Sequence, residues 1–131
     1  MEMVLQFLKD CGTFYIATAD ENGKPHVRPF GAVVLFEGKL YIATNNQKDV
    51  YKQMIANPSV EISGMTGGKW IRLAADVVRD DRREARVGVI EGAPELKSMY
   101  DPDDGIFEVL YLKNATATIC SFTEAPETVT F

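Results

Sequence analysis

Apolar residues near the N-terminus repeat at helical spacing. Those between positions 4 and 11 fall on one face of a helix, and Gly12 follows as a residue that favours a helix end. The next segment, Thr13–Ala19, is rich in β-branched and aromatic residues, which predicts a strand. Asn22-Gly23, a dipeptide typical of tight hairpins, then predicts a turn into a second strand over about Pro25–Phe36.

Short glycine turns separate further strands along the chain. Glu37-Gly38 predicts that the first three strands form an antiparallel meander, and Gly67-Gly68 predicts another hairpin. The tail from Thr123 is predicted to be irregular. The remaining strands are predicted over Lys39–Thr44, Val60–Thr66, Lys69–Val78 and, as one or two strands, within Ile106–Phe122.

Two more helices and a short helical turn around Glu95–Tyr100 are predicted between the strands. Apolar spacing from Val50 predicts a short helix that Asn57-Pro58 ends, because the residue before proline avoids the helical region. Asp80 or Asp81 is predicted to cap another helix that runs to about Ile90.

About six strands joined by short hairpins predict a mainly β fold with flanking helices. Small antiparallel sheets of this kind close into a barrel or sandwich, because closure removes their exposed edges. Helices and strands alternate too irregularly for a parallel doubly wound sheet. The length of 131 residues, without repeat or linker, indicates one domain over residues 1–131.

Charge and composition exclude several functions. The net charge is −5, which argues against general nucleic-acid binding but still allows a small anion site. The longest apolar run, Ala32–Phe36, is far shorter than the roughly 20 residues of a membrane span. Cys11 and Cys120 form no CxxC pair and are expected to be small buried residues in a reducing cytoplasm. The N-terminus lacks the basic region of a secretory signal, so we expect a cytoplasmic protein.

The segment around Pro29 is a first candidate site. His26 and Arg28 are two residues apart and are expected to point to one face of a strand, with Val27 and Pro29 on the other. Proline within a strand indicates an edge or an interrupted ladder, which leaves backbone groups free for a ligand. The alternative is an edge strand that carries solvated basic residues.

A second candidate site lies where Thr44 and Asn45 end a strand and a helix begins near Lys48. Unpaired N–H groups and the positive dipole at a helix start favour a phosphate. Lys52 lies four residues after Lys48 and is expected on the same helix face. The alternative is an ordinary solvated helix face.

Trp70 and Arg72 form a third candidate, on one face of a strand. An indole beside a guanidinium can stack on a planar ligand. A core tryptophan next to a surface arginine is the alternative. His26 is the only histidine, and the sequence shows no metal-ligand spacing and no nucleotide-binding glycine motif.

The order of three segments resembles a known family. They read FYIATADENGKPHVRPFG, GKLYIATNNQKDVYKQMIANPSVEI and KWIRLAADVV. This pattern is similar to the pyridoxamine 5′-phosphate oxidase-like family of FMN-binding split β-barrels. The resemblance covers nearly the whole chain and is most specific over Leu40–Ile62.

The resemblance implies a homodimer that holds one FMN in each of two clefts at the subunit interface. Arg28, Pro29 and Phe30 are then expected to contact the isoalloxazine ring. Thr44 and Asn45 are expected near the ribityl chain or the phosphate.

Other residues complete the set that the resemblance implies. Lys48 and Lys52 are expected to contribute charge to the phosphate, with Tyr51 as a neighbour on the same helix. Trp70 and Arg72 are expected to reach the cofactor from the other subunit. No metal is expected.

The sequence also departs from the true oxidases of this family. It lacks their C-terminal arginine- and histidine-bearing segment, and Asp49 stands where related oxidases often have a basic residue. Oxidation of pyridoxamine phosphate is therefore not expected. The chain looks more like the general-stress and nitroimidazole-resistance branches.

Three functions are compatible with this resemblance. The first is an FMN-dependent oxidoreductase that passes electrons from a reduced donor to a small nitroaromatic or quinone-like acceptor. The second is a flavin-binding sensing module without turnover. The third is a haem or deazaflavin binder of the same fold; haem is less favoured because His26 is the sole candidate imidazole ligand.

Overall fold

The computed structural model describes residues 1–131 and contains eight strands, three α-helices and one 3-10 helix. In chain order these are α1 (Glu2–Cys11), β1 (Phe14–Ala19), β2 (Pro25–Phe30), β3 (Val33–Phe36), β4 (Lys39–Asn45), α2 (Asp49–Ala56), β5 (Ser59–Thr66), β6 (Lys69–Asp80), α3 (Arg83–Gly92), η1 (Pro94–Ser98), β7 (Phe107–Ser121) and β8 (Glu127–Thr130). The prediction of a mainly β fold with flanking helices is confirmed. None of the helices is long and apolar enough to cross a membrane.

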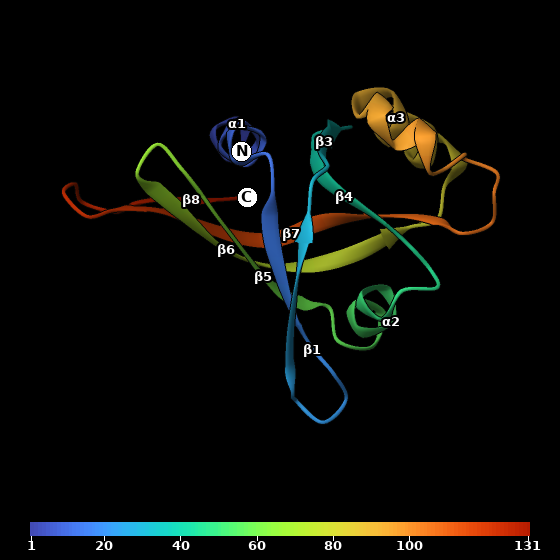
Figure 1. The fold of residues 1–131 in the computed structure, drawn as a ribbon, viewed down its shortest axis with the longest axis horizontal. Coiled ribbons are helices and arrows are strands. Elements are labelled where there is room, and N and C mark those ends of the chain that lie inside the picture. The colour runs from blue at the N-terminus through green and yellow to red at the C-terminus, as the bar shows by residue number, and fades with distance from the viewer.

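One strongly curved sheet runs through the whole molecule (Figure 1). Its strand order is β2-β1-β5-β6-β7-β4-β3, β8 pairs with β7, and every pairing is antiparallel. The two end strands, β2 and β3, are consecutive in the chain and are joined only by Gly31-Ala32. The sheet therefore curves back on itself, and its two ends meet at this link without pairing.

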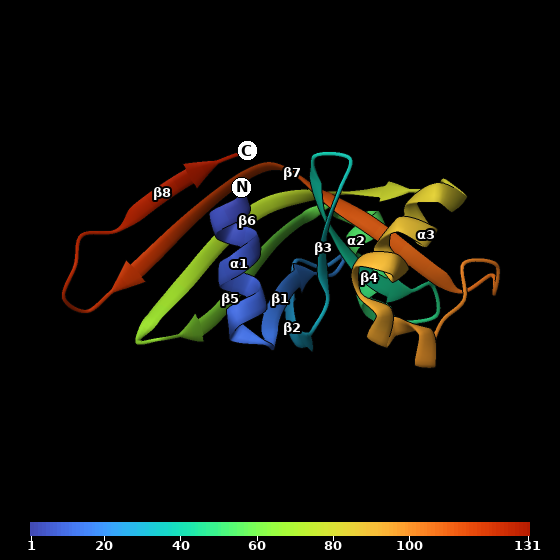
Figure 2. The ribbon, with the colours of Figure 1, turned by 90° about the horizontal axis from the view of Figure 1, so that it is seen from above.

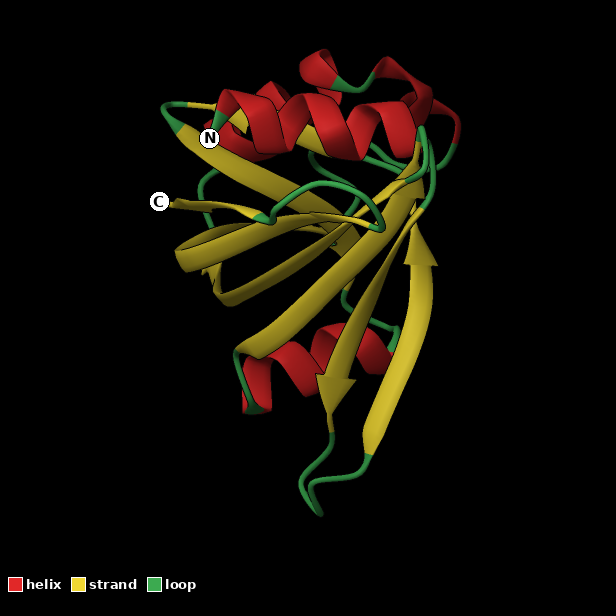
Figure 3. Ribbon diagram, turned by 90° about the vertical axis from the view of Figure 1, so that its left-hand side faces the viewer, coloured by secondary structure: helices red, strands yellow, loops and turns green.

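The main core lies inside the curve of the sheet. Strands such as β1 and β5 alternate buried and accessible residues, as the two-residue period of a strand requires. α1 adds Val4 and Leu8 to this core, and its end at Gly12 has φ 74°, as the sequence predicts. α1 and α3 lie on one side of the sheet and α2 on the other (Figure 3). Among the fully buried core side chains are Phe14, Ile16, Ile62, Leu73 and Leu110.

A second core fixes α3 and η1 against the end of the sheet formed by β3 and β4 (Figure 2). Val89 of α3 and Leu96 of η1 pack with Val34 and Tyr41. The approach is close, because a Cβ added at Gly88 would lie 2.3 Å from the Phe36 ring. This packing determines where η1 and the residues after it are placed.

A buried carboxylate anchors the end of β6. Tyr41 donates a hydrogen bond to Asp80 over 2.6 Å, and Arg82 donates to the same carboxyl group over 2.9 and 3.0 Å. The Arg82 guanidinium holds the pKa of Asp80 well below its usual range, while burial raises the pKa of Tyr41. Arg82 also pairs with Glu37, so the network links β6 to the β3–β4 turn.

The prediction of one strand over Pro25–Phe36 is wrong. The segment forms β2, which pairs with β1, and β3, which pairs with β4. Gly31-Ala32 lies between them, where the chain leaves one end of the sheet and enters the other. The expected meander is consequently two separate hairpins, since β2 and β3 are not paired.

Two further local predictions are wrong. Asp80 ends β6 and Asp81 does not cap α3, which begins at Arg83 without a side-chain cap. The tail from Thr123 is not irregular throughout, because β8 pairs with β7 over Thr116–Ile119. Cys11 and Cys120 are unpaired and only partly buried. The glycine turns are confirmed: Gly67 and Gly68 both have positive φ, which suits a two-residue hairpin.

Candidate functional site

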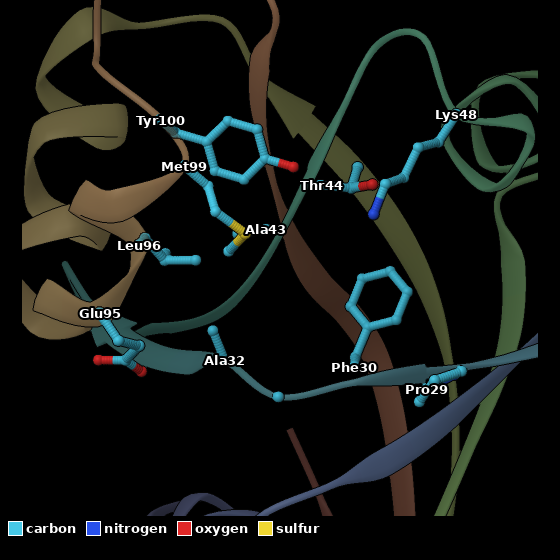
Figure 4. Close-up of a pocket in the computed structure, with 11 residues that line it drawn as sticks. Pro29, Phe30, Ala32, Ala43, Thr44, Lys48, Glu95, Leu96, Met99 and Tyr100 are labelled. Atoms are coloured by element: carbon cyan, nitrogen blue, oxygen red, sulfur yellow. The ribbon is translucent and has the colours of Figure 1, made fainter.

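A cavity of about 250 Å³ lies at the seam where the two ends of the sheet meet (Figure 4). On one side are Pro29 and Phe30 of β2, and on the other are Ala43 and Thr44 of β4. β3 pairs with β4 only as far as Ile42, so residues 43–45 of β4 have no strand on that edge. Of the two alternatives predicted from Pro29, the edge strand is the one observed, because β2 lies at the end of the sheet and its ladder with β1 is continuous through Pro29.

One end of the cavity is suited to an anion. Lys48 lines it and occupies the N-cap position of α2, where no side chain caps the first-turn N–H groups. Thr44 is only 3% exposed, yet its hydroxyl makes no hydrogen bond to another residue and borders the cavity. Because no fully buried side-chain oxygen lacks a hydrogen-bond partner, this hydroxyl is accessible from the cavity, where it can donate to a bound ligand.

The other walls are largely apolar and were missed by sequence reasoning. Leu96 of η1, with Met99 and Tyr100 just after it, faces the β2–β3 link, and Glu95 lies at the rim. The only sequence signal was three apolar residues within a short polar turn after Pro94. Their role could not be predicted because the packing of α3, distant in sequence, brings η1 to the seam.

Asn45 contacts the cavity through another residue. Its Oδ1 accepts the Gln47 backbone N–H over 3.0 Å, and its Nδ2 donates to the Tyr100 hydroxyl over 2.9 Å. Tyr100 lines the cavity whereas Asn45 does not. The direct contact predicted between Asn45 and a cofactor stays a prediction.

Arg28 extends from β2 toward α2 instead of lining the cavity. Its Nη1 donates to Thr18 Oγ1 over 2.7 Å, and its Nη2 donates to Gln53 Oε1 over 2.9 Å. Burial lowers the pKa of Arg28, although it remains charged at any ordinary pH. As predicted, His26 and Arg28 share one face of β2, which is the less exposed of the two. The flavin contact predicted for Arg28 stays a prediction.

The structure separates Lys48 from Lys52. Lys52 lines a different surface hollow together with Asp20 and Asp49, so acidic side chains surround it. Tyr51 packs at the margin of the main core, and burial raises its pKa. These two residues of α2 are not brought to the cavity that Lys48 lines.

Trp70 and Arg72 share one face of β6, as predicted, on the outside of the sheet. They line an open hollow with Tyr15 and Val27. Arg72 pairs with Glu61 over 2.9 Å, and the Trp70 ring packs against Phe122 with centroids 4.9 Å apart. Within one chain this hollow is distinct from the cavity at the seam.

Comparison with known proteins relates the whole chain to a protein family. Residues 1–113 match the family described as pyridoxamine 5′-phosphate oxidase. A search of curated protein sequences found no match.

Solved structures share the fold. The crystal structure of a NimC/NimA family protein from Clostridium acetobutylicum superimposes with a TM-score of 0.96 and is 55% identical, over 100% of this chain and 92% of that one. A pyridoxamine 5′-phosphate oxidase-related, FMN-binding protein from Nostoc punctiforme has a TM-score of 0.69 at 16% identity, over 99% and 95% of the two chains.

A haem-binding protein from Mycobacterium smegmatis has a TM-score of 0.73 at 15% identity, over 95% of this chain and 55% of that one. At such low identity, this likeness and that to the Nostoc protein show a common fold. The match over residues 1–113 and the 55% identical structure carry the assignment. The chain therefore belongs to the pyridoxamine 5′-phosphate oxidase family of split β-barrels.

Proposed function

We propose that this protein is an FMN-dependent oxidoreductase that acts as a homodimer and reduces a small nitroaromatic or quinone-like acceptor. The observation that carries the proposal is the cavity at the seam, which combines apolar walls with one cationic end. FMN combines a planar ring system with a phosphate, so the two ends of the cavity match the two parts of the cofactor.

The residues present fit this cofactor. Lys48 and the uncapped start of α2 supply positive charge for the phosphate, and the unpartnered Thr44 hydroxyl supplies a hydrogen-bond donor. Pro29 and Phe30 offer apolar surface for the ring. Small-molecule sites generally have this composition, with mostly apolar walls and a few placed polar groups.

The chemistry asks little of the protein beyond holding and shielding the cofactor. FMN, when bound, supplies hydride and single-electron transfer. The apolar walls exclude water from the ring, and Lys48 and Thr44 hold the phosphate end. The cavity lining contains no histidine, and Glu95 at the rim is its only carboxylate. This lining suits electron transfer, which needs no paired general acid and base.

A second copy of the chain is part of the proposal. The cavity of about 250 Å³ is smaller than the roughly 300–1,000 Å³ of most ligand sites, which suggests that one chain supplies only part of the site. The outer face of β1, β2 and β6 exposes Val27 (68%) and Tyr15 (48%) beside Trp70. Apolar surface of this kind favours a protein–protein interface.

The relatives support the choice of cofactor. The 55% identical structure is named as a NimC/NimA family protein, and a more distant neighbour is named as FMN-binding. Two unpaired cysteines also suit a reducing cytoplasm. Haem is the competing cofactor, since another neighbour is named as haem-binding. Against haem, His26 lies outside the cavity and is 3.0 Å from Asp20.

The absorption spectrum of the purified protein tests the cofactor. We expect the purified protein to show the two-band absorption spectrum of a flavin. If the protein is colourless when purified, added FMN should bind to it and give the same two bands. A Soret band, or failure to bind FMN, would overturn the proposal. Bleaching of the bound flavin by NADH or NADPH and its reoxidation by a nitroaromatic or quinone would support an enzyme. A flavin that no donor reduces would instead support a sensing role.

A further inference from the structure

We propose that the Tyr100 hydroxyl donates a hydrogen bond to an acceptor oxygen of the second ligand, the quinone or nitroaromatic electron acceptor, and that Asn45 orients this hydroxyl. Tyr100 would then select for oxygen-bearing ligands. This inference rests on the proposed function, because it assumes that a second ligand enters the cavity at the seam.

A chain of hydrogen bonds sets the direction of the Tyr100 proton. The Gln47 backbone N–H donates to Asn45 Oδ1 over 3.0 Å, which fixes which end of the Asn45 side chain is the amide nitrogen. That nitrogen, Nδ2, donates to the Tyr100 oxygen over 2.9 Å. The hydroxyl is thereby an acceptor toward Asn45, and its own proton is free for another partner.

No residue of the chain takes that proton. The Tyr100 hydroxyl makes only the hydrogen bond from Asn45, and Tyr100 lines the cavity. Figure 4 shows its ring reaching from the segment after η1 toward β4. The free donor is therefore available to a ligand in the cavity.

The ring is also held in place. It packs on Phe107 with centroids 5.0 Å apart and an interplanar angle of 30°, and Tyr100 is half-buried. Contacts at both the ring and the oxygen make the hydroxyl a preorganised donor. A preorganised group loses little conformational freedom when the ligand binds.

The second ligand is a better hydrogen-bond partner for the Tyr100 hydroxyl than the cofactor ring is. Phe30, from β2, and Tyr100 lie on opposite sides of the cavity in Figure 4. The proposed position of the flavin ring along Pro29 and Phe30 leaves the wall formed by Met99 and Tyr100 for the acceptor. Quinones and nitroaromatics carry oxygens that accept a hydrogen bond at the edge of a planar ring.

A pair of probe ligands isolates the hydrogen bond. Menadione and 2-methylnaphthalene share one carbon skeleton, but only menadione carries oxygens. Equilibrium dialysis of the FMN-loaded protein gives the dissociation constants of both probes. The ratio of the two constants measures how strongly the protein prefers menadione. Tyr100→Phe is expected to reduce the preference for menadione about three- to tenfold, the typical effect of one hydrogen bond. The matched control is Tyr111→Phe, because Tyr111 lies outside the cavity and its hydroxyl makes no hydrogen bond.

Asn45→Asp tests the orienting role without changing side-chain size. A carboxylate can only accept, so the Tyr100 proton turns toward residue 45 and away from the ligand. We expect Asn45→Asp to lower the menadione preference as far as Tyr100→Phe does, and the double variant to lower it no further. The added charge also acts on the carbonyl dipoles of menadione, and a further loss of preference in the double variant relative to Tyr100→Phe would measure that effect.

The outcomes are distinct from those that test the proposed function. An unchanged ratio in a folded Tyr100→Phe protein would overturn the inference even if FMN turns over normally. A wild-type ratio in Asn45→Asp would overturn the orienting role of Asn45. If FMN does not bind, the proposed function fails, and the same dialysis without FMN still decides whether Tyr100 discriminates between the probes.

Discussion

Arg28 Nη2 donates a hydrogen bond to Gln53 Oε1 over 2.9 Å and so ties the edge strand β2 to helix α2. Thr18 of β1 lies between them, since its hydroxyl accepts from Arg28 over 2.7 Å and donates to Gln53 over 2.6 Å. β2 carries Pro29 and Phe30, and the start of α2 carries Lys48. The network therefore connects the strand and the helix that line opposite parts of the cavity.

Thr18→Val removes the hydroxyl at the centre of this network and keeps the side-chain shape. We expect a loss of about 1–3 kcal/mol in the free energy of unfolding, because Thr18 is buried and Arg28 and Gln53 lose a shared partner. Urea denaturation measures this loss. A change below about 0.5 kcal/mol would show that the network contributes little to stability.

Thr44→Val makes the same chemical change at a hydroxyl that has no partner in the chain and is accessible from the cavity. The free energy of unfolding should change by less than about 0.5 kcal/mol, because no hydrogen bond within the chain is lost. FMN affinity should instead fall about three- to tenfold. Fluorescence titration with FMN measures the affinity, and an unchanged value would argue against Thr44 as a phosphate ligand.

Lys48→Ala is expected to weaken FMN binding about tenfold or more, because it removes the cationic side chain at the anion end of the cavity. The effect should shrink as salt concentration rises. Lys52→Ala is the matched comparison, on the same helix but in a hollow with Asp20 and Asp49. Equal losses in both variants would show that the phosphate lies elsewhere than beside Lys48.

Val27→Asp is expected to convert the proposed dimer into monomers. Val27 is 68% exposed on the outer face of the sheet, where a second copy would bury it, and an unpaired buried carboxylate is costly. Light scattering coupled to size-exclusion chromatography gives the mass, and FMN retention should fall with dimer content. Ile55→Asp, at an exposed apolar position on α2, should leave the mass unchanged. A wild-type protein that is monomeric would contradict the prediction.

Asp80→Asn is expected to cost about 3 kcal/mol at pH 7, because Arg82 loses the buried carboxylate and the new amide N–H₂ group faces another donor. The pKa of Asp80 is lowered in the folded protein, so its contribution is fully present above the unfolded pKa of about 4. The contribution is lost as pH falls through the folded pKa. The difference between wild type and variant should therefore shrink below about pH 4.

Urea denaturation at pH 7 and at pH 3 measures that difference. Asp81→Asn is the control, since Asp81 is an exposed neighbour that pairs only with Arg79. It should change the free energy of unfolding by less than about 0.5 kcal/mol at either pH. A difference for Asp80→Asn that is the same at both pH values would contradict the proposed role of its charge.

Local patterns determined most of the secondary structure. The apolar period of α1, the turns at Asn22-Gly23 and Gly67-Gly68 and the start of α2 after Lys48 were all predicted correctly. These features depend on neighbours within a few residues, so the sequence carries them directly. The family resemblance was likewise confirmed by the match over residues 1–113.

Errors arose where the partner of a segment lies far away in sequence. Nothing local shows that Pro25–Phe30 pairs with β1 while Val33–Phe36 pairs with β4. The last residues become β8 only because β7 is long enough to offer them an edge. Strand pairing is a tertiary interaction, and short segments do not encode it uniquely.

The sequence by itself determined that the chain forms short antiparallel hairpins and that Thr44 and Lys48 lie just before the start of a helix. It also determined which family the pattern resembles. Only the tertiary structure decided which of these residues meet. The barrel seam brings Phe30 and Thr44 together, and the packing of α3 adds Leu96 and Tyr100. The physical reason is that a cavity forms from surfaces joined by long-range packing, whereas local sequence determines only the elements that carry those surfaces.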